Sequence, residues 1–351
     1  MGCTQTDVST GYMTGLPTPG NISSASRSGS RRLMFSDSPE TLNSEVFSTA
    51  NITLWHDYMN TSSTSVMHRV YGWHLNSYGA SIKVGLTVQN LSSTNTIELQ
   101  QVYREKQTST NYLSTGICLA KACLGGTMVS ISPADNRFGQ TVGLIEETTV
   151  ANNYLFGFVY EFTVARYSGS GNLNYKIRTV ATRTTSNNLR SITSNPVNPD
   201  SNPPHPRGSW AQGALITGTL PTYTVGTTAS TNISNGSTDN VLSASASYDS
   251  GNARDNTGHW GAIYRVTLPI TNNTGTTKTV RIRLNARAED YGGAVKRSSG
   301  TNGVPRLLVN ADPNVAHVMD FSAPAGSSST QFDVMHAGAA SLAVAVYVTT
   351  I

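Results

Sequence analysis

The sequence predicts an all-β protein with two antiparallel β-sandwich halves, immunoglobulin-like or jelly-roll-like, and an extended N-terminal arm. Ser, Thr and Asn supply roughly a third of the 351 residues, and these types favour turns and strands. Apolar and polar residues alternate with a period of two in several segments, as in 81–89. Long apolar stripes with a helical period are missing, so the only helical turn we expect lies near 39–43.

The first element is the arm, residues 1–32. Its stretch from Pro17 to Ser30 is built from Pro, Gly, Asn, Ser and Arg, with only Ile22 and Ala25 as apolar residues. Such a segment buries too little apolar surface to fold alone. We therefore expect it to be flexible, or to become ordered against a neighbouring molecule by adding a strand to an exposed sheet edge.

A first sandwich is expected over residues 33–192. Its strand candidates carry aromatic and β-branched residues at strand spacing, and the strongest of them is 154–164. The other candidates lie at 55–58, 66–74, 81–89, 96–103, 127–131 and 173–182.

A proline-rich segment, residues 193–206, follows. Five prolines exclude a helix or a central strand there, so it is expected to be an exposed linker between domains. A second sandwich is then expected over residues 207–351. Its strand candidates lie at 213–220, 262–270, 277–285, 315–321, 330–335 and 342–349.

A weak internal repeat supports two similar halves. KVGLTVQNLSSTNTIEL (83–99) and YRVTLPITNNTGTTKTVRI (264–282) both contain an alternating strand, then Asn with a Ser/Thr/Gly turn, then a second alternating strand. Asn tolerates left-handed backbone and caps turns. We interpret the two segments as hairpins at equivalent places in two sandwiches, and one larger jelly-roll is the competing interpretation.

Four stretches carry a family resemblance. They are Leu33–Glu40 (LMFSDSPE), His205–Gly208 (HPRG), Gly261–Tyr264 (GAIY) and Tyr291–Val295 (YGGAV). With the repeat, they resemble uncharacterised secreted immunoglobulin-like surface proteins of bacilli, some described alongside copper amine oxidase N-terminal-like domains. The resemblance implies a bacterial extracellular or surface protein. It implies no activity and no oxidase chemistry.

The three cysteines allow several interpretations. Cys118 and Cys123 are expected either to close a small loop by a disulfide or to be two small buried residues. Gly2-Cys3 resembles the end of a bacterial lipobox, which would make Cys3 a lipid anchor. The start also fits a myristoylation pattern at Gly2, and an unmodified terminus is the third alternative.

Signatures of catalysis and of cofactor binding are missing from the sequence. It contains no Gly-x-Ser-x-Gly elbow, no phosphate-binding glycine loop and no histidine pair at metal-ligand spacing. We therefore expect no enzyme activity, no catalytic residues, no cofactor and no metal site. The formal net charge of +4 is mild for this length, so no specific nucleic-acid partner is expected.

The expected function is that of a non-enzymatic structural protein of a cell surface, extracellular matrix or fibre, self-assembling through the arm. Trp55, Trp73, Trp210 and Trp260 give one alternative, a carbohydrate-binding or adhesion module that stacks sugars on exposed rings, unless each ring lies in the core. A viral or phage capsid protein is a further alternative. Expected partners are other copies of the chain, or glycans and cell-surface polymers, with a membrane contacted only through a lipid at Cys3.

Overall fold

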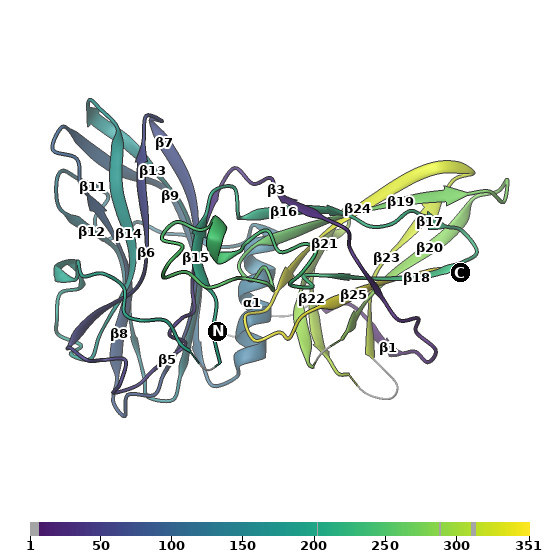
Figure 1. Ribbon diagram of the computed structural model, residues 1–351, viewed down its shortest axis with the longest axis horizontal. Helices are drawn as coiled ribbons and strands as arrows, with labels where there is room; N and C mark the ends of the chain where they lie inside the picture. Colours follow the sequence, from purple (N-terminus) through teal and green to yellow (C-terminus); the bar gives the residue numbers. More distant parts are fainter. Residues whose placement is uncertain (1–6, 202, 288, 310–313) are drawn as a thin grey trace.

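A computed structural model of the 351-residue chain describes residues 7–351 except 202, 288 and 310–313. Two β-sandwiches lie side by side, and helix α1 (Tyr112–Gly125) stands between them (Figure 1). The all-β class predicted from the sequence is confirmed. Among the described residues, no helix is long and apolar enough to cross a membrane.

The first sandwich packs an eight-stranded sheet on a four-stranded one. The larger sheet contains β10 (Val129–Ser130), β9 (Asn95–Ser109), β13 (Leu155–Gly169), β7 (Ser65–Asn76), β4 (Arg32–Ser36) and β15 (Arg207–Trp210), with β11 (Arg137–Phe138) on β9 and β5 (Thr41–Leu42) on β7. The smaller sheet has the order β12 (Val142–Val150), β8 (Ile82–Asn90), β14 (Leu173–Thr182) and β6 (Asn51–Thr61), and the short helix η1 (Leu189–Ser191) contacts β12, β8 and β14.

The second sandwich packs a six-stranded sheet on a seven-stranded one. The first has the order β1 (Thr10–Tyr12), β23 (Asn314–Ala323), β20 (Lys278–Ala286), β25 (Val344–Thr350), β18 (Thr228–Ile233) and β2 (Gly20–Asn21). The second has the order β22 (Gly300–Leu307), β21 (Tyr291–Arg297), β24 (Gly326–His336), β19 (Ile263–Asn272), β16 (Leu215–Thr219) and β3 (Ala25–Arg27), with β17 (Tyr223–Thr224) on β19. The short helix η2 (Ala244–Ala246) contacts β15.

Most strand pairs are antiparallel, as expected, but the sheets are mixed. Parallel pairs join β4 and β5 to β7, β16 and β17 to β19, and β2 to β18. The predicted helical turn near 39–43 is wrong, because Thr41 and Leu42 form β5 and pair with β7.

The N-terminal arm lies against the second sandwich of its own chain (Figure 1). Strands β1 and β2 are the two edges of the six-stranded sheet, and β3 is one edge of the seven-stranded sheet. At the remaining edge, the Val8 amide donates to the Gly303 carbonyl of β22 at 2.9 Å. Val8 and Ile22 are buried among the core residues of this half. The arm therefore contacts all four sheet edges of the second sandwich.

Helix α1 was not anticipated from the sequence. The Asn111 side chain accepts from the Ser114 amide at its N-terminus, and Gly126 ends it with a φ of 68°. The helix contacts β9 and β13 of the first sandwich and β21, β22 and β24 of the second. Because β-strands cover α1 on both sides, its sequence does not need a polar face, and it therefore lacks the apolar stripe with a helical period by which a surface helix is recognised. Gly116 allows this close approach, since a Cβ there would lie 2.6 Å from the Gly338 backbone nitrogen.

The proline-rich segment 193–206 lies against the first sandwich, and strands beyond it still belong to that half. Strand β15 pairs with β4 in the eight-stranded sheet, and the Val197 amide donates to the Thr53 carbonyl at 2.9 Å. One hydrophobic core also includes residues of both halves, among them Phe35 and Tyr71 with Ile216 and Tyr264. The chain crosses between the sandwiches more often than a single linker allows.

The two repeated segments occupy equivalent places, but neither is a hairpin. Strands β8 and β9 lie in the two different sheets of the first sandwich, and β19 and β20 do the same in the second. The turns match in detail. Asn90 donates to the Asn95 carbonyl and accepts from the Ser92 amide, and Asn272 does so with the Thr276 carbonyl and the Thr274 amide. Each Asn therefore stabilises the turn that carries the chain from one sheet to the other.

Candidate functional site

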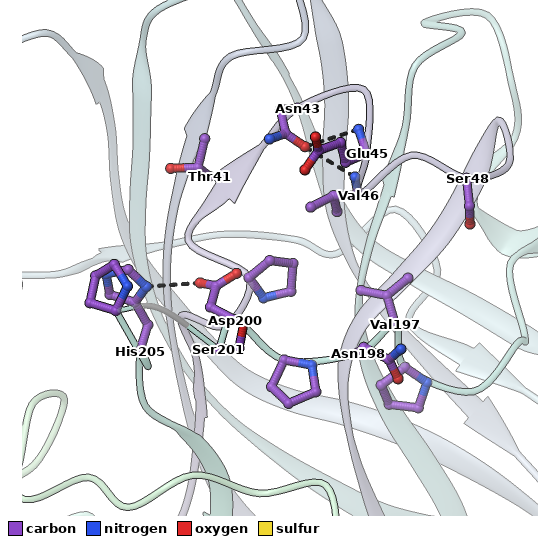
Figure 2. A pocket seen from close by; sticks show the side chains of 14 residues that line it. Thr41, Asn43, Glu45, Val46, Ser48, Val197, Asn198, Asp200, Ser201 and His205 are labelled. Carbon is purple, nitrogen blue, oxygen red and sulfur yellow. Dashed lines mark hydrogen bonds and ion pairs between the residues drawn. The ribbon is translucent and has the colours of Figure 1, made fainter.

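A groove of about 660 Å³ lies on the first sandwich, and we call it the proline groove (Figure 2). One wall is formed by residues 39–48, and the other by residues 196–201 and 203–205. It is lined by Pro39, Thr41, Asn43, Glu45, Val46, Ser48, Pro196, Val197, Asn198, Pro199, Asp200, Ser201, Pro203 and His205. A cavity of this volume suits a small-molecule ligand.

The first wall follows strand β4 and is fixed by local hydrogen bonds. The Asn43 side chain accepts from the amides of Glu45 and Val46, both at 3.0 Å, and so holds a tight turn (Figure 2). Buried Leu42 and Phe47 flank this turn and attach it to the core. The polar side chains of the wall are thus presented by a backbone that is anchored on both sides.

The second wall is the proline-rich segment. Proline fixes φ and removes conformational freedom, which makes an otherwise polar segment stiff. Buried Arg207 attaches it to the first wall, because its Nη1 donates to the carbonyls of Val197 at 2.8 Å and Ser38 at 3.0 Å. The Asp200 amide also donates to the Ser38 hydroxyl at 2.8 Å. The two walls are therefore rigidly connected before any ligand binds.

An imidazole held between two carboxyl groups lies at one side of the groove, and Figure 2 shows His205 with the first of them, Asp200. His205 Nδ1 lies 2.8 Å from Asp200 Oδ2, and its Nε2 lies 3.5 Å from Glu40 Oε2. Asp200 Oδ2 also accepts from the Glu40 amide at 2.7 Å. The hydrogen bond to Asp200 raises the pKa of His205, whereas burial raises the pKa of Glu40. The arrangement favours a protonated, positively charged His205.

Asp37 lies behind this cluster and is fully buried. Its Oδ1 has no hydrogen-bond partner among the described residues. Burial, with repulsion from Glu40 and Asp200, raises its pKa well above the ordinary value. Asp37 therefore holds its proton more tightly than an ordinary aspartic acid does.

The groove presents more acidic than basic groups. Glu45 and Asp200 are the carboxyl groups of its lining, Glu40 adds a third carboxyl group beside His205, and His205 is its basic group. The side chains of Asn43, Asn198, Thr41, Ser48 and Ser201 add amides and hydroxyls. Such a surface can exchange hydrogen bonds with a neutral or cationic polar ligand, and it repels an anionic one.

The residues predicted from the sequence do not form this site. Trp55, Trp73 and Trp210 are buried in the core. Trp55 donates to the Ser209 hydroxyl at 3.1 Å, and Trp210 donates to the Ser243 carbonyl at 2.8 Å. Trp260 is half-buried and packs against the core. The predicted stacking platform is therefore wrong for the three buried rings, because their faces are covered.

The predicted Cys118–Cys123 disulfide does not form. Both cysteines lie on α1, where Cys123 is a free buried thiol and Cys118 is disulfide-bonded. Burial raises the pKa of Cys123 to about 11, so it remains an unreactive thiol. The predicted lipid anchor, Cys3, lies outside the described residues.

A second polar cluster, in the second sandwich, resembles a serine–histidine dyad but is closed. Ser234 Oγ lies 3.0 Å from His259 Nδ1 and 2.9 Å from His336 Nε2, and Tyr291 Oη lies 3.1 Å from His336 Nδ1. All four side chains are buried. No substrate reaches them in this conformation, so the cluster is a hydrogen-bond network of the core.

Sequence reasoning missed Glu40, Asn43, Asp200 and His205 as site residues. One signal was present, because two of the stretches that carry the family resemblance, Leu33–Glu40 and His205–Gly208, meet at this groove. Their contact is a tertiary feature that one sequence does not reveal. Among the described residues, no group of three or more His, Cys, Asp or Glu side chains could hold a metal ion.

Comparisons with known proteins add little. No family model and no curated protein matches the chain. The CUB1-EGF-CUB2 domain of human MASP-1/3 is 8% identical at a TM-score of 0.20, covering 84% of this chain and 99% of that one. The CBM22 tandem domain of Paenibacillus barcinonensis Xyn10C is 7% identical at a TM-score of 0.20, covering 95% and 91%. A Paenibacillus xanthan lyase is 12% identical at 0.15, covering 85% and 25%. Likenesses this weak place no constraint on function.

Proposed function

We propose that the chain is a non-catalytic extracellular binding protein whose proline groove holds a short segment of a neutral or amino-bearing glycan. One observation carries the proposal, namely a preorganised groove lined by carboxyl, amide and hydroxyl groups. Vicinal sugar hydroxyls donate and accept hydrogen bonds, and these side chains offer both kinds of partner. Rigid walls reduce the entropy lost on binding.

The charge of the groove supports the choice of ligand class. Glu45 is exposed, and Asp200 and Glu40 lie together beside His205. An anionic glycan would place its charge against this excess of carboxylates, whereas a hydroxyl or an ammonium group would not. The extracellular location is supported by the disulfide at Cys118, because such bonds persist in oxidising compartments.

The position of His205 supports a binding role over catalysis. A general base must be aimed at the proton that it removes. The His205 ring has Asp200 at one nitrogen and Glu40 near the other, so both ring nitrogens face carboxyl groups instead of a serine or cysteine of the described chain. We expect a hydrolase screen on oligosaccharides to yield no product. Turnover that disappears in Glu40→Gln would overturn this part of the proposal.

The binding proposal is tested with an array of neutral, amino-bearing and acidic oligosaccharides, followed by calorimetry on the best ligand. We expect neutral or amino-bearing glycans to bind and acidic ones to fail. Asn43→Ala and Asp200→Asn should each weaken binding by roughly tenfold or more, as expected for a lost hydrogen bond to a charged or buried group.

Glu98→Gln is the matched control, because Glu98 of β9 pairs with Arg137 of β11, and neither residue lines the groove. The affinity of the Glu98→Gln variant for the glycan should equal that of the unaltered chain. Binding that persists in both groove variants, or that depends on Trp260, would refute the assignment of the ligand to this groove.

Self-assembly, the main expectation from the sequence, also remains a proposal. The arm strands β1, β2 and β3 pair within their own chain. A neighbouring molecule can receive the arm only after these pairs separate. Assembly by strand addition would therefore be an exchange of arms between copies.

A further inference from the structure

A second groove of about 410 Å³ lies on the second sandwich, and we call it the arginine groove. Residues 9–13 of the arm form one side. Arg281 and Arg283 of β20 and His317 of β23 form the other. The groove therefore exists only while the arm lies beside β23.

The charges of this groove are not balanced. Asp320 accepts from Arg281 Nε and Nη2, both at 2.7 Å, and its Oδ1 lies 3.0 Å from His317 Nε2. These contacts lower the pKa of Asp320 to about 2, so it is a carboxylate, and both of its oxygens already accept from Arg281. Asp320 thus pairs directly with Arg281, and it attracts Arg283 only through space, without an ion pair.

Arg283 has only neutral partners among the described residues. Its Nη1 donates to the Thr349 hydroxyl at 3.0 Å, and its guanidinium lies 5.9 Å from the centre of the Tyr347 ring. No described carboxylate forms an ion pair with it. Partial burial and the charge of Arg281 both lower its pKa. A half-buried guanidinium in a cavity is stabilised by an oxyanion, because the oxyanion accepts hydrogen bonds from its parallel N–H groups.

We propose that the arginine groove binds the oxyanion of a small or polymeric ligand, either a carboxylate or a phosphate, through Arg283. The arm hydroxyls of Ser9 and Thr10 line the same space, and the exposed Tyr12 ring stands at its margin. The site is distinct from the proline groove, which has the opposite charge. The chain would then carry one acidic and one basic site on different sandwiches.

The test is calorimetry on the full chain with two oxyanion probes, glucuronate and inorganic phosphate, and with glucose as the neutral comparison. We expect at least one oxyanion to bind, with an affinity that falls as salt rises, and glucose to show no binding at this site. The stronger probe identifies the source of the anion, an acidic sugar or a phosphate group.

Substitutions assign the binding to Arg283. We expect Arg283→Gln to lower the affinity for the oxyanion roughly tenfold or more. Arg283→Lys keeps the charge but loses the parallel N–H groups of the guanidinium, so we expect an intermediate loss of affinity. Arg265→Gln is the matched control, because Arg265 is an ion-paired surface arginine of the opposite sheet. If Arg283→Gln does not fold, the affinity of Arg283→Lys for the oxyanion decides whether Arg283 forms the site.

Two results would overturn the proposal. One is the absence of binding for both oxyanions. The other is equal affinity in the Arg283 variants, the Arg265 control and the unaltered chain, which would mean that the anion binds elsewhere or without specificity. Neither result would depend on the proline groove, so failure here leaves the proposed glycan site untouched.

Discussion

At the scale of single residues, the molecule buries an unusual set of polar side chains. His68 and His74 lie inside the first sandwich, and His259 and His336 lie inside the second. Burial lowers the pKa of His68 and His336 to about 3 and that of His74 and His259 to about 4, all below the ordinary value of 6.5. These histidines are therefore neutral in the folded protein at neutral pH.

This burial predicts acid-sensitive stability. Between pH 6.5 and about 4 the unfolded chain binds protons at these histidines that the folded chain does not, so the free energy of unfolding falls as pH falls. Each such histidine contributes a slope of up to about 1.4 kcal/mol per pH unit. Urea titrations at pH 7, 6 and 5 measure the slope, and stability that stays level across this range would contradict the prediction.

His336→Gln is the informative variant, because glutamine keeps polar atoms near Ser234 and Tyr291 but does not titrate. Its stability at pH 7 should be lower, since the network loses its fitted ring. Its dependence on pH should nevertheless be shallower than that of the unaltered chain. His205 has the opposite sign, because its raised pKa gives a contribution that is lost as pH rises through that pKa.

Residue-level prediction from the sequence succeeded for turns and failed for sites. Asn90 and Asn272 were assigned to equivalent turns from their Ser/Thr/Gly context, and local hydrogen bonds explain that success. Trp55, Trp73 and Trp210 were misjudged because residue type alone does not distinguish an exposed ring from a buried one. Asp200 and His205 gain significance only through Glu40, which lies far away in the sequence.

At the scale of elements, strands could be predicted from alternation, whereas α1 could not. Its sequence, YLSTGICLAKACLG, contains two glycines and no polar face, because both sandwiches cover it. The local signals that could have identified it were Asn111 at its start and the Gly125-Gly126 pair at its end. The assumed hairpins failed for a related reason, since one sequence does not show which sheet a strand joins.

The N-terminal arm covers the sheet edges of the second sandwich, so its removal should change how the chain associates. Removing residues 1–28 leaves the edges of β23, β18, β16 and β22 without their pairing partners. Open edges pair with other chains. We expect the truncated chain to self-associate and to melt at a lower temperature, as measured by light scattering and by thermal unfolding.

Tyr12→Ser is the control for the truncation, because Tyr12 is 70% exposed and its backbone still pairs with β23. This variant should behave like the unaltered chain. If the truncated chain is monomeric and melts at the same temperature, the arm makes no contribution to closing the edges.

At the scale of the whole molecule, the two sandwiches form one structural unit. Arg69 of the first sandwich pairs with Glu161 at 2.6 Å and donates to the carbonyls of Ala214 at 2.8 Å and Gly261 at 3.2 Å. Helix α1 and the shared core add apolar contacts between the halves. The sequence predicted the two halves correctly in outline. The proline-rich segment between them was predicted to be an exposed linker, but prolines stiffen the wall of a groove just as they stiffen a linker.

One unit implies one unfolding transition. We expect calorimetry to show a single peak whose calorimetric and van't Hoff enthalpies agree. A protease site inserted at the exposed residues 193–195 provides a second measurement, because the nicked chain should stay associated and melt cooperatively. Two separate peaks, or two fragments that part in native buffer, would show that the sandwiches are independent domains.

The position of the arm also fixes an order of events during biosynthesis. Residues 7–28 leave the ribosome well before their pairing partners, because Thr10 pairs with Ala316, and Asn21 pairs beside a strand whose own neighbour ends at Thr350. The edge of β23 that receives β1 therefore cannot close until residues 314–316 have been made. The first sandwich also waits for β15, which is made after the proline-rich segment. Pairing of β1 is thus a late step relative to its own synthesis, and a ribosome stalled before residue 314 would hold a chain with nothing for β1 to pair with.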